Sequence, residues 1–288
     1  MPRYDVNGRV ALITGGARGI GFALAGALAA RGALIALVDL NADEVAAAAQ
    51  RLGPGRAIGV ASDVTDRDAI ERAVAAATER FGGVDIVVAN AGIAPTPAPV
   101  RLMPPDEFER VLEVDLLGVY RTAYAGLEQV VARRGQLVLV ASVYAFMNGM
   151  MNAPYAVAKA GVEQLGRALR AELSVHGASA TVAYFGFVDT VMVQEAFEKR
   201  RQATGREDDL APAFVLRRIT PQQAGEALAL AIERRQPRVI APRWWAVASV
   251  LRGLLNPALD YAAERAQKVQ DSLREADPPG RPRYFGSS

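Results

Sequence analysis

The chain has 288 residues, of which 51% are hydrophobic and 22% are charged, a balance typical of a globular protein rather than a disordered one. Lys and Arg number 33 against 31 Asp and Glu, and the resulting formal charge of +2 does not predict a nucleic-acid partner. Because the chain has no cysteine and one histidine, we expect no disulfide, no thiol catalysis and no bound metal. The sequence shows neither a secretory signal nor an apolar run of membrane-spanning length, so we expect a cytoplasmic protein.

Apolar runs rich in β-forming residues alternate with alanine-rich runs of helical character. Strands are predicted at residues 9–14, 33–38, 56–61, 84–89, 136–141, 179–185 and 237–241. Helices are predicted near residues 19–31, 41–52, 66–80, 105–133, 153–176 and 221–235. The strands lack polar alternation, which is typical of strands covered on both faces. The pattern predicts an α/β fold with one Rossmann-type, doubly wound parallel sheet of about seven strands and helices on both faces, in a domain over residues 1–242.

Three segments depart from this alternation. Residues 189–220 form a long, charged connection of the kind that often serves as a lid. Residues 243–276 carry two apolar stripes at helical spacing, one before and one after Pro257, and so predict two amphipathic helices. We expect these helices to pack on the domain or across a subunit interface near the substrate cleft, with membrane contact the less favoured alternative. Residues 277–288 are predicted to be disordered.

A glycine-rich loop follows the first predicted strand and opens a helix, over the residues Thr14-Gly15-Gly16-Ala17-Arg18-Gly19-Ile20-Gly21. Glycine lets the backbone approach a pyrophosphate, and the helix N-terminus offers free N–H groups to its charge. Asp39 ends the second strand, where a carboxylate can accept hydrogen bonds from ribose hydroxyls and repel a 2′-phosphate. Asp39 could instead cap the next helix, and Arg18 mildly favours NADP. The strand-end residue carries more weight, so we expect NAD.

A second motif pairs Tyr155 with Lys159 on one face of a helix, because the two residues are four apart. The pKa of a free tyrosine, near 10, is too high for a general base at neutral pH. A lysine ammonium one turn away favours the phenolate and so lowers that pKa. Ser142 leaves the strand at 136–141, at the sheet edge where doubly wound folds bind ligands. Its hydroxyl can hold a substrate oxygen.

Taken in order along the chain, these motifs resemble the short-chain dehydrogenase/reductase family. The resemblance extends over residues 8–241 and rests on the loop from Thr14 to Gly21, Asp63-Val64, Asn90-Ala91-Gly92, Ser142, Tyr155-x-x-x-Lys159 and Gly186–Thr190. It implies that Tyr155 passes a proton, that Ser142 orients the carbonyl or alcohol, and that Lys159 also binds the nicotinamide ribose. The cofactor contacts it implies are Gly15, Arg18, Gly19, Ile20, Gly21, Asp39, Asp63, Val64, Asn90, Ala91, Gly92, Tyr155, Lys159, Val188 and Thr190. The family is usually dimeric or tetrameric, so we expect a homodimer or homotetramer.

One position departs from the family pattern. Asp115 stands where relatives usually carry an asparagine that supports a water chain from the lysine to solvent, and we include it among the candidate catalytic residues. Its carboxylate could stabilise the Lys159 ammonium and thereby raise the pKa of Tyr155. It could instead keep the backbone hydrogen bonds and hold the water chain as an acceptor only.

Methionine and aromatic residues gather in the segments that build the family's substrate pocket. They are Tyr144, Phe146, Met147, Met150, Phe187 and Met192. Such residues suit a flexible, lipophilic ligand, although ordinary core packing explains them equally well. The leading hypothesis is an NAD-dependent alcohol dehydrogenase or ketoreductase acting on a bulky hydrophobic substrate such as a steroid, terpenoid or lipid-like molecule. The alternative is a cofactor-binding sensor or scaffold whose turnover is weak or lost because of Asp115.

Overall fold

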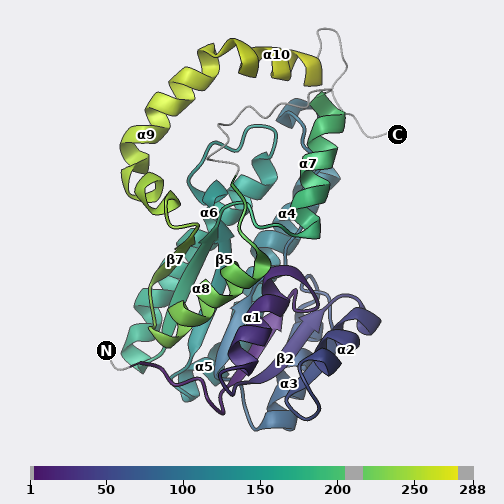
Figure 1. Ribbon diagram of the computed structural model, residues 1–288, viewed down its shortest axis with the longest axis vertical. Coiled ribbons are helices and arrows are strands. Elements are labelled where there is room, and N and C mark those ends of the chain that lie inside the picture. Colours follow the sequence, from purple (N-terminus) through teal and green to yellow (C-terminus); the bar gives the residue numbers. More distant parts are fainter. Residues whose placement is uncertain (1–2, 205–216, 278–288) are drawn as a thin grey trace.

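The computed structural model describes residues 3–204 and 217–277 (Figure 1). Its strands are β1 Val10–Thr14, β2 Leu34–Asp39, β3 Ala57–Ala61, β4 Ile86–Ala89, β5 Gln136–Ser142, β6 Ser179–Phe185 and β7 Arg238–Ala241. All pair in parallel in one seven-stranded sheet of order β3-β2-β1-β4-β5-β6-β7. The predicted doubly wound sheet is confirmed. Its strand order reverses between β1 and β4, and the ligand crevice of such sheets lies at this switch point.

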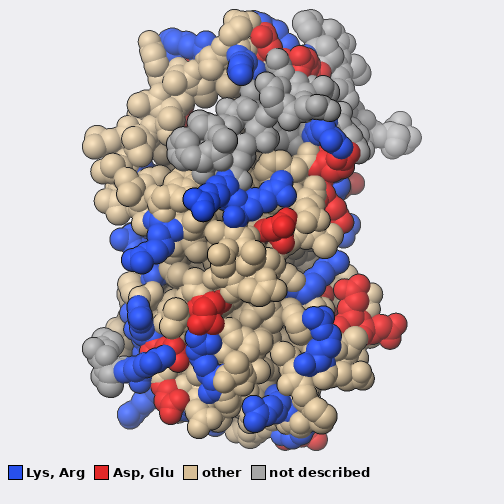
Figure 2. Space-filling view, in the orientation of Figure 1, with Lys and Arg blue, Asp and Glu red and all other residues tan. Residues whose placement is uncertain are grey.

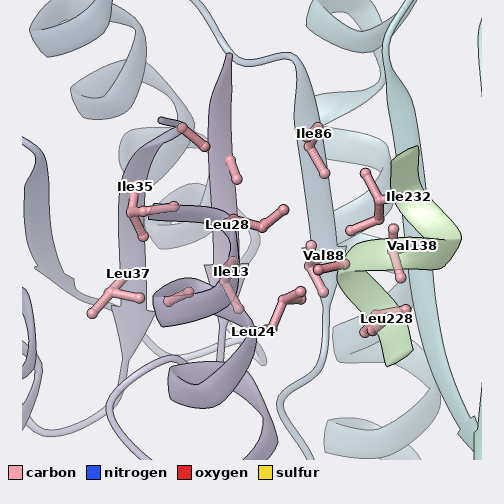
Figure 3. Packing of buried hydrophobic residues seen from close by; sticks show 14 of the residues in the cluster. Ile13, Leu24, Leu28, Ile35, Leu37, Ile86, Val88, Val138, Leu228 and Ile232 are labelled. Atoms are coloured by element: carbon pink, nitrogen blue, oxygen red, sulfur yellow. The ribbon is translucent and has the colours of Figure 1, made fainter. Parts of the chain in front are cut away.

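Helices cover both faces of the sheet. They are α1 Gly19–Ala29, α2 Ala42–Arg51, α3 Arg67–Phe81, α4 Pro105–Leu112, α5 Gly118–Ala132, α6 Ala153–Leu173, α7 Val191–Thr204, α8 Pro221–Glu233, α9 Trp245–Arg265 and α10 Gln267–Ala276. On one face, Leu24 and Leu28 of α1 and Leu228 of α8 pack against the strands, as Figure 3 shows. A second buried cluster lies on the other face, between the sheet and α3, α5 and α6. The two layers hold the carboxyl ends of the strands in fixed positions.

The helix predicted over 105–133 contains an irregularity. A π-helical turn, Glu113–Leu117, joins α4 to α5 without ending the helix, and Asp115 lies in it. Such π-helical bulges occur frequently at functional sites. Helix α3 begins after its N-cap, Asp66, whose side chain accepts a hydrogen bond from the backbone N–H of Ala69 at 3.1 Å.

The charged segment 189–220 contains a helix that the sequence analysis did not predict. Helix α7 occupies Val191–Thr204, and the chain returns to pair Ile219 with Val188 in a parallel bridge. Residues 205–216 of this segment, and residues 278–288 of the predicted disordered tail, lie outside the described residues.

The C-terminal extension is helical as predicted, but the break is in a different place. Helix α9 continues through Pro257 and ends at Arg265. In a helix, the ring of Pro257 approaches the carbonyl group of the residue four positions earlier, which is Gly253. Gly253 has no side chain that would add to this steric conflict. Figure 1 shows α9 and α10 as an arc at the outside of the molecule. Within the described ranges, no helix has both the length and the apolar composition needed to cross a membrane.

Candidate active site

The glycine-rich loop after β1 is held against the end of β4. Asn90 Nδ2 donates hydrogen bonds to the backbone oxygens of Thr14 and Gly15, at 2.9 and 3.1 Å. The Thr14 hydroxyl accepts hydrogen bonds from the backbone N–H groups of Asn90 and Ala91, at 3.1 and 3.3 Å. Gly15 has a φ of 63°, and a Cβ there would lie 2.9 Å from Ala91 Cα. Only glycine satisfies both the backbone angle and this close approach.

The N-terminus of α1 has the properties of an anion site. The helix begins at Gly19, and its N-cap residue, Arg18, makes no side-chain hydrogen bond to the first turn. That turn contains no acidic residue, so its N–H groups and the positive end of the helix dipole are available to a negatively charged ligand. The loop and helix therefore fit the pyrophosphate of a dinucleotide.

Gly21 serves this site differently from the other glycines. A Cβ at Gly21 would lie 2.2 Å from the backbone oxygen of Gly15 and 2.8 Å from Asn90 Nδ2. The residue therefore allows α1 to pack closely on the loop and does not line the cleft. The resemblance implied a cofactor contact at Gly21, whereas the structure places it behind the loop.

Asp39 lies at the end of β2 beside the glycine-rich loop. Its carboxylate accepts hydrogen bonds from the backbone N–H of Ala17 and of Leu40, both at 2.9 Å. Helix α2 is capped by another residue, Asn41, whose side chain accepts hydrogen bonds from the N–H groups of Asp43 and Glu44. The alternative role of Asp39 as the cap of that helix is therefore wrong.

A cleft of about 1500 Å³ runs along the carboxyl edge of the sheet. The expected cofactor residues that line it are Gly15, Arg18, Gly19, Ile20, Asp39, Asp63, Val64, Asn90, Ala91, Gly92, Tyr155, Lys159, Val188 and Thr190. Ser142 and Asp115 line the same cleft. The fold thus brings the candidate nucleotide site and the candidate catalytic residues into one continuous space.

Ser142, Tyr155 and Lys159 come together at the end of β5 and the start of α6. The Ser142 hydroxyl donates a hydrogen bond to the backbone oxygen of Phe185 at 3.3 Å. Tyr155 lies near enough to Ser142 for the serine hydroxyl to act on the pKa of the phenol. Lys159 follows Tyr155 by one turn of α6, and its Nζ lies 5.3 Å from the centre of the tyrosine ring. Hydroxyl, phenol and ammonium groups therefore meet at one point of the cleft.

Asp115 forms a buried ion pair with Lys159. The distance from Asp115 Oδ2 to Lys159 Nζ is 3.1 Å, and the Asp115 side chain is fully buried. The other carboxylate oxygen accepts a hydrogen bond from the backbone N–H of Ile93 at 2.7 Å. Gly92 makes room for the pair, because a Cβ there would lie 2.9 Å from Asp115 Oδ2. The residue that departs from the family pattern thus acts directly on the candidate catalytic lysine.

The pKa values of this group reflect burial and mutual charge. Burial raises the pKa of Tyr155, the Asp115 carboxylate raises it further, and the Lys159 ammonium and the Ser142 hydroxyl oppose this rise only in part. The net direction is upward, so the lowering expected from Lys159 is present but outweighed, and the raising effect considered for Asp115 acts in the expected direction. Burial acts to lower the pKa of Lys159, but the carboxylate of Asp115 and the Tyr155 phenol outweigh it and the pKa is raised. The lysine therefore holds its proton firmly.

A second cavity opens beside Ser142 and Tyr155. The residues that line it are Ala94, Pro95, Pro97, Ser142, Val143, Tyr144, Met150, Met151, Asn152, Tyr155, Gly186, Phe187, Met192, Val193, Ala196 and Phe197. They include four of the six predicted pocket residues, Tyr144, Met150, Phe187 and Met192. No charged side chain is among the described residues of this lining. The cavity is therefore suited to the apolar body of an uncharged ligand.

The remaining two predicted pocket residues lie elsewhere. Phe146 is 5% exposed and packs in the core, with its ring centre 5.9 Å from Tyr184 and 6.4 Å from Trp245. Met147 packs against the same core cluster. Both lie between Tyr144 and Met150, where the chain leaves the cavity lining and returns to it. For these two residues the structure supports the core-packing alternative.

Phe197 also lines the cavity, although it was not among the predicted pocket residues, and its ring centre lies 5.3 Å from that of Phe187. The sequence contains an indication of helix α7, because apolar and charged residues alternate at helical spacing over 191–204. The high charge of the segment favoured a loop instead. In the part of the chain that the structure describes, no group of three or more His, Asp or Glu side chains could hold a metal ion.

Known proteins share this sequence pattern and fold. The family model described as short chain dehydrogenase matches residues 9–201. A cis-4-hydroxycyclohexanecarboxylate dehydrogenase of Sinomonas cyclohexanicum is 37% identical over 188 residues, which cover 64% of this chain and 75% of that protein. A 3-oxoacyl-(acyl-carrier-protein) reductase of Vibrio cholerae is 35% identical over 201 residues, which cover 69% of this chain and 82% of that protein.

Solved structures agree with these matches. A 3-ketoacyl-(acyl-carrier-protein) reductase from Brucella melitensis complexed with NADH superposes with a TM-score of 0.72 and 26% identity, covering 82% of this chain and 97% of that one. A short-chain type dehydrogenase/reductase from Mycobacterium marinum gives a TM-score of 0.70 and 28% identity, covering 80% of this chain and 89% of that one. The chain therefore belongs to the short-chain dehydrogenase/reductase family of oxidoreductases.

Proposed function

We propose that this oxidoreductase is an NAD-dependent alcohol dehydrogenase or ketoreductase that acts on a bulky, uncharged, hydrophobic secondary alcohol or ketone. The observation that carries the proposal is the uncharged, mainly apolar cavity that meets the nucleotide cleft at Ser142 and Tyr155. A substrate body in this cavity has its reacting oxygen beside two hydroxyl groups. A steroid, terpenoid or lipid-like molecule fits this description.

The roles of the catalytic residues follow from their contacts. Ser142 donates a hydrogen bond that holds the substrate oxygen, and Tyr155 gives a proton to that oxygen in reduction or takes it in oxidation. Lys159 stabilises the phenolate that Tyr155 becomes in reduction. When bound, the nicotinamide supplies the hydride acceptor or donor. Ser142 and Tyr155 both line the substrate cavity and the cofactor cleft, which supports these roles.

The preference for NAD rests on Asp39. Its carboxylate lies at the strand end beside the loop, where it can accept hydrogen bonds from the ribose hydroxyls and repel a 2′-phosphate. Arg18 lines the same cleft and favours binding of the 2′-phosphate of NADP, so Arg18 and Asp39 have opposite effects on the preference for NAD over NADP. The fixed position of Asp39, set by two backbone hydrogen bonds, favours NAD.

The decisive experiment measures reduced cofactor formation at 340 nm with a panel of hydrophobic secondary alcohols, each with NAD⁺ and with NADP⁺. Each alcohol that contains a free carboxylate is paired with its neutral methyl ester. We expect the esters to have the higher kcat/KM, because the described lining offers no cation to a carboxylate. A uniform preference for the free acids would contradict the proposed substrate class, and a preference for NADP⁺ would contradict the role of Asp39.

A second candidate function is that of a cofactor-binding sensor or scaffold with weak turnover. The Asp115–Lys159 ion pair favours it, because the carboxylate raises the pKa of the tyrosine that must exchange a proton. The alcohol panel separates the two functions. Tight cofactor binding with no turnover on any alcohol or ketone would support the sensor.

We also propose that the protein assembles as a homodimer or homotetramer through α5 and α6. Large apolar side chains are exposed on this surface, among them Leu117, Tyr120, Tyr124 and Val157. The first three are spaced at i, i+3 and i+7 and therefore form one helical stripe. Sedimentation velocity tests the assembly, and replacement of Tyr124 by glutamate should shift the protein toward the monomer.

A further inference from the structure

Beyond its first turn, helix α9 turns polar residues toward the body of the protein and apolar residues outward. Arg252, Asn256 and Asp260 are spaced at i, i+4 and i+8, and all three contact the domain. The exposed residues Val247 and Leu254, the latter 77% exposed, lie on the other side of the helix. In Figure 2 the surface at the place that α9 occupies in Figure 1 is largely free of charged side chains. The first turn of α9 packs on the core through Trp245 and Ala248, and beyond it the three polar contacts hold the helix to the domain.

Two of these contacts fix the segment that leads from Ser142 to α6. Asn256 Nδ2 donates a hydrogen bond to the backbone oxygen of Phe146 at 2.9 Å. Asp260 accepts a hydrogen bond from Asn148 Nδ2 at 2.9 Å. Asn148 Oδ1 in turn accepts a hydrogen bond from the backbone N–H of Met150, also at 2.9 Å. A chain of hydrogen bonds thus runs from α9 to a methionine that lines the substrate cavity.

The third contact reaches the catalytic helix. The guanidinium of Arg252 donates two hydrogen bonds, in a bidentate arrangement, to the carboxylate of Glu163 of α6, at 2.8 and 2.9 Å. Glu163 is 5% exposed and lies one turn beyond Lys159. At the start of α9, Trp245 packs on Gly186, where a Cβ would lie 2.6 Å from the indole nitrogen. Gly186 lines the substrate cavity, so α9 touches three of the segments that surround the reacting centre.

We propose that Asn256 and Asp260 of α9 are positioning residues that hold segment 146–152 in place and thereby set which substrates the cavity accepts. The proposal rests on the proposed alcohol or ketone chemistry of the same site. Neither residue lines the substrate cavity or the cofactor cleft. Their effect therefore falls on KM and on the discrimination between substrates, because the proton-transfer residues and the cofactor residues keep their places.

The test uses the full-length chain and the isosteric variant Asn256→Asp, which replaces the donor to the Phe146 carbonyl with an acceptor. We expect KM for a bulky hydrophobic ketone to rise roughly five-fold, the loss expected for one hydrogen bond. The kcat value and the NADH dissociation constant should stay within about two-fold of the wild type. Hydrogen–deuterium exchange should become faster in peptides covering residues 143–152. The matched control is Leu254→Ser, on the outward side of the same helix, which should change none of these quantities.

A rescue experiment tests the second contact. N148D places two carboxylates opposite each other and should raise KM and the exchange rate of segment 146–152. The double variant N148D/D260N restores a donor and an acceptor with their positions exchanged, and should return both quantities toward the wild-type values. Failure of this rescue would overturn the proposal.

The readouts separate this proposal from the proposed function. If no alcohol or ketone is turned over by the wild type, the proposed function fails, and hydrogen exchange still reports whether α9 holds segment 146–152. If the wild type is active, N256D with unchanged KM or unchanged exchange would overturn the positioning role. An equal effect of Leu254→Ser would overturn it as well, since the effect would then not depend on the inward contacts.

Discussion

The Asp115 carboxylate lies 3.1 Å from the ammonium of Lys159, and both side chains are buried. Of the two roles considered for this aspartate, direct electrostatic contact with the lysine is the one that agrees with this distance. The carboxylate offsets part of the positive charge that would otherwise favour the Tyr155 phenolate. Proton exchange at Tyr155 is therefore coupled to a charge that relatives with asparagine do not carry.

Replacing Asp115 by asparagine should lower the pKa of Tyr155. The phenolate that accepts a proton in alcohol oxidation forms above this pKa, so kcat/KM for oxidation rises as the pH rises through it. Without the carboxylate this rise should move to lower pH. The rate near pH 7 should increase by roughly two- to ten-fold, since one pKa unit corresponds to a factor of ten. Profiles of kcat/KM from about pH 6 to about pH 10 provide the measurement.

Two other results would be informative about Asp115. An unchanged profile would show that the carboxylate serves only as an acceptor, such as for the backbone N–H of Ile93. A complete loss of activity would contradict both roles and assign the carboxylate a catalytic task of its own. A thermal unfolding measurement is the control, because the pair is buried and its disruption can also destabilise the fold.

Tyr155→Phe should abolish turnover and leave cofactor binding nearly unchanged. The substitution removes the phenolic hydroxyl and keeps the ring, whose centre lies 5.7 Å from that of Tyr144. A loss of at least about 100-fold in kcat is expected for a general acid–base residue. NADH binding by fluorescence titration should stay within about two-fold. Substantial remaining activity would show that another group transfers the proton.

Much of this site could be predicted from sequence because it depends on local spacing and on strand ends. Parallel strands place their carboxyl ends at one edge of the sheet, so the loop after β1, Asp39 at the end of β2 and Ser142 at the end of β5 had to lie at that edge. Tyr155 and Lys159 share a helix face whatever the rest of the fold does. These predictions required only the order of elements.

The lining of the substrate cavity and the orientation of α9 could not be predicted, because they depend on contacts between residues that are distant in the sequence. The sequence pattern does not show that Phe146 points into the core while Met150, four residues later, reaches the cavity. The outward direction of the apolar side of α9 was also hidden, since an apolar stripe is normally expected to be buried. Only the partners of Arg252 and Asn256, 89 and 110 residues away, explain why this helix turns its polar side inward.

Asp39→Ala should weaken NAD binding and narrow the difference between NAD and NADP. The variant removes the acceptor for the ribose hydroxyls and the negative charge that repels a 2′-phosphate, while Arg18 remains in the cleft. We expect KM for NAD to rise by about ten-fold, a loss of about 1.4 kcal/mol. Steady-state kinetics with both cofactors measure the effect. An unchanged ratio of kcat/KM for the two cofactors would contradict the assignment of Asp39 to cofactor selection.

Truncation after Ala241 should alter substrate affinity or oligomeric state, and the structure adds an expected loss of stability. The shortened chain lacks Arg252, which leaves the carboxylate of Glu163 buried in α6 with only the more distant Arg167, at 3.9 Å. It also lacks Trp245, which is 3% exposed in the core. Removal of one partner of a buried ion pair lowers the free energy of unfolding by about 3–5 kcal/mol. Because Arg252 is partly exposed, we expect the loss of the Arg252–Glu163 pair to lie at or below the lower end of this range.

The control for this truncation is a chain that ends after Arg265. It loses α10 and keeps every contact between α9 and the domain that involves Trp245, Arg252 and Asn256. We expect the 1–241 chain to unfold at least about 5 °C below the full-length protein and the 1–265 chain to remain close to it. Differential scanning calorimetry, sedimentation velocity and KM for a hydrophobic ketone are measured on all three chains. If the 1–241 chain matches the full-length protein in melting temperature, size and kinetics, α9 neither stabilises the domain nor contributes to its active site or assembly.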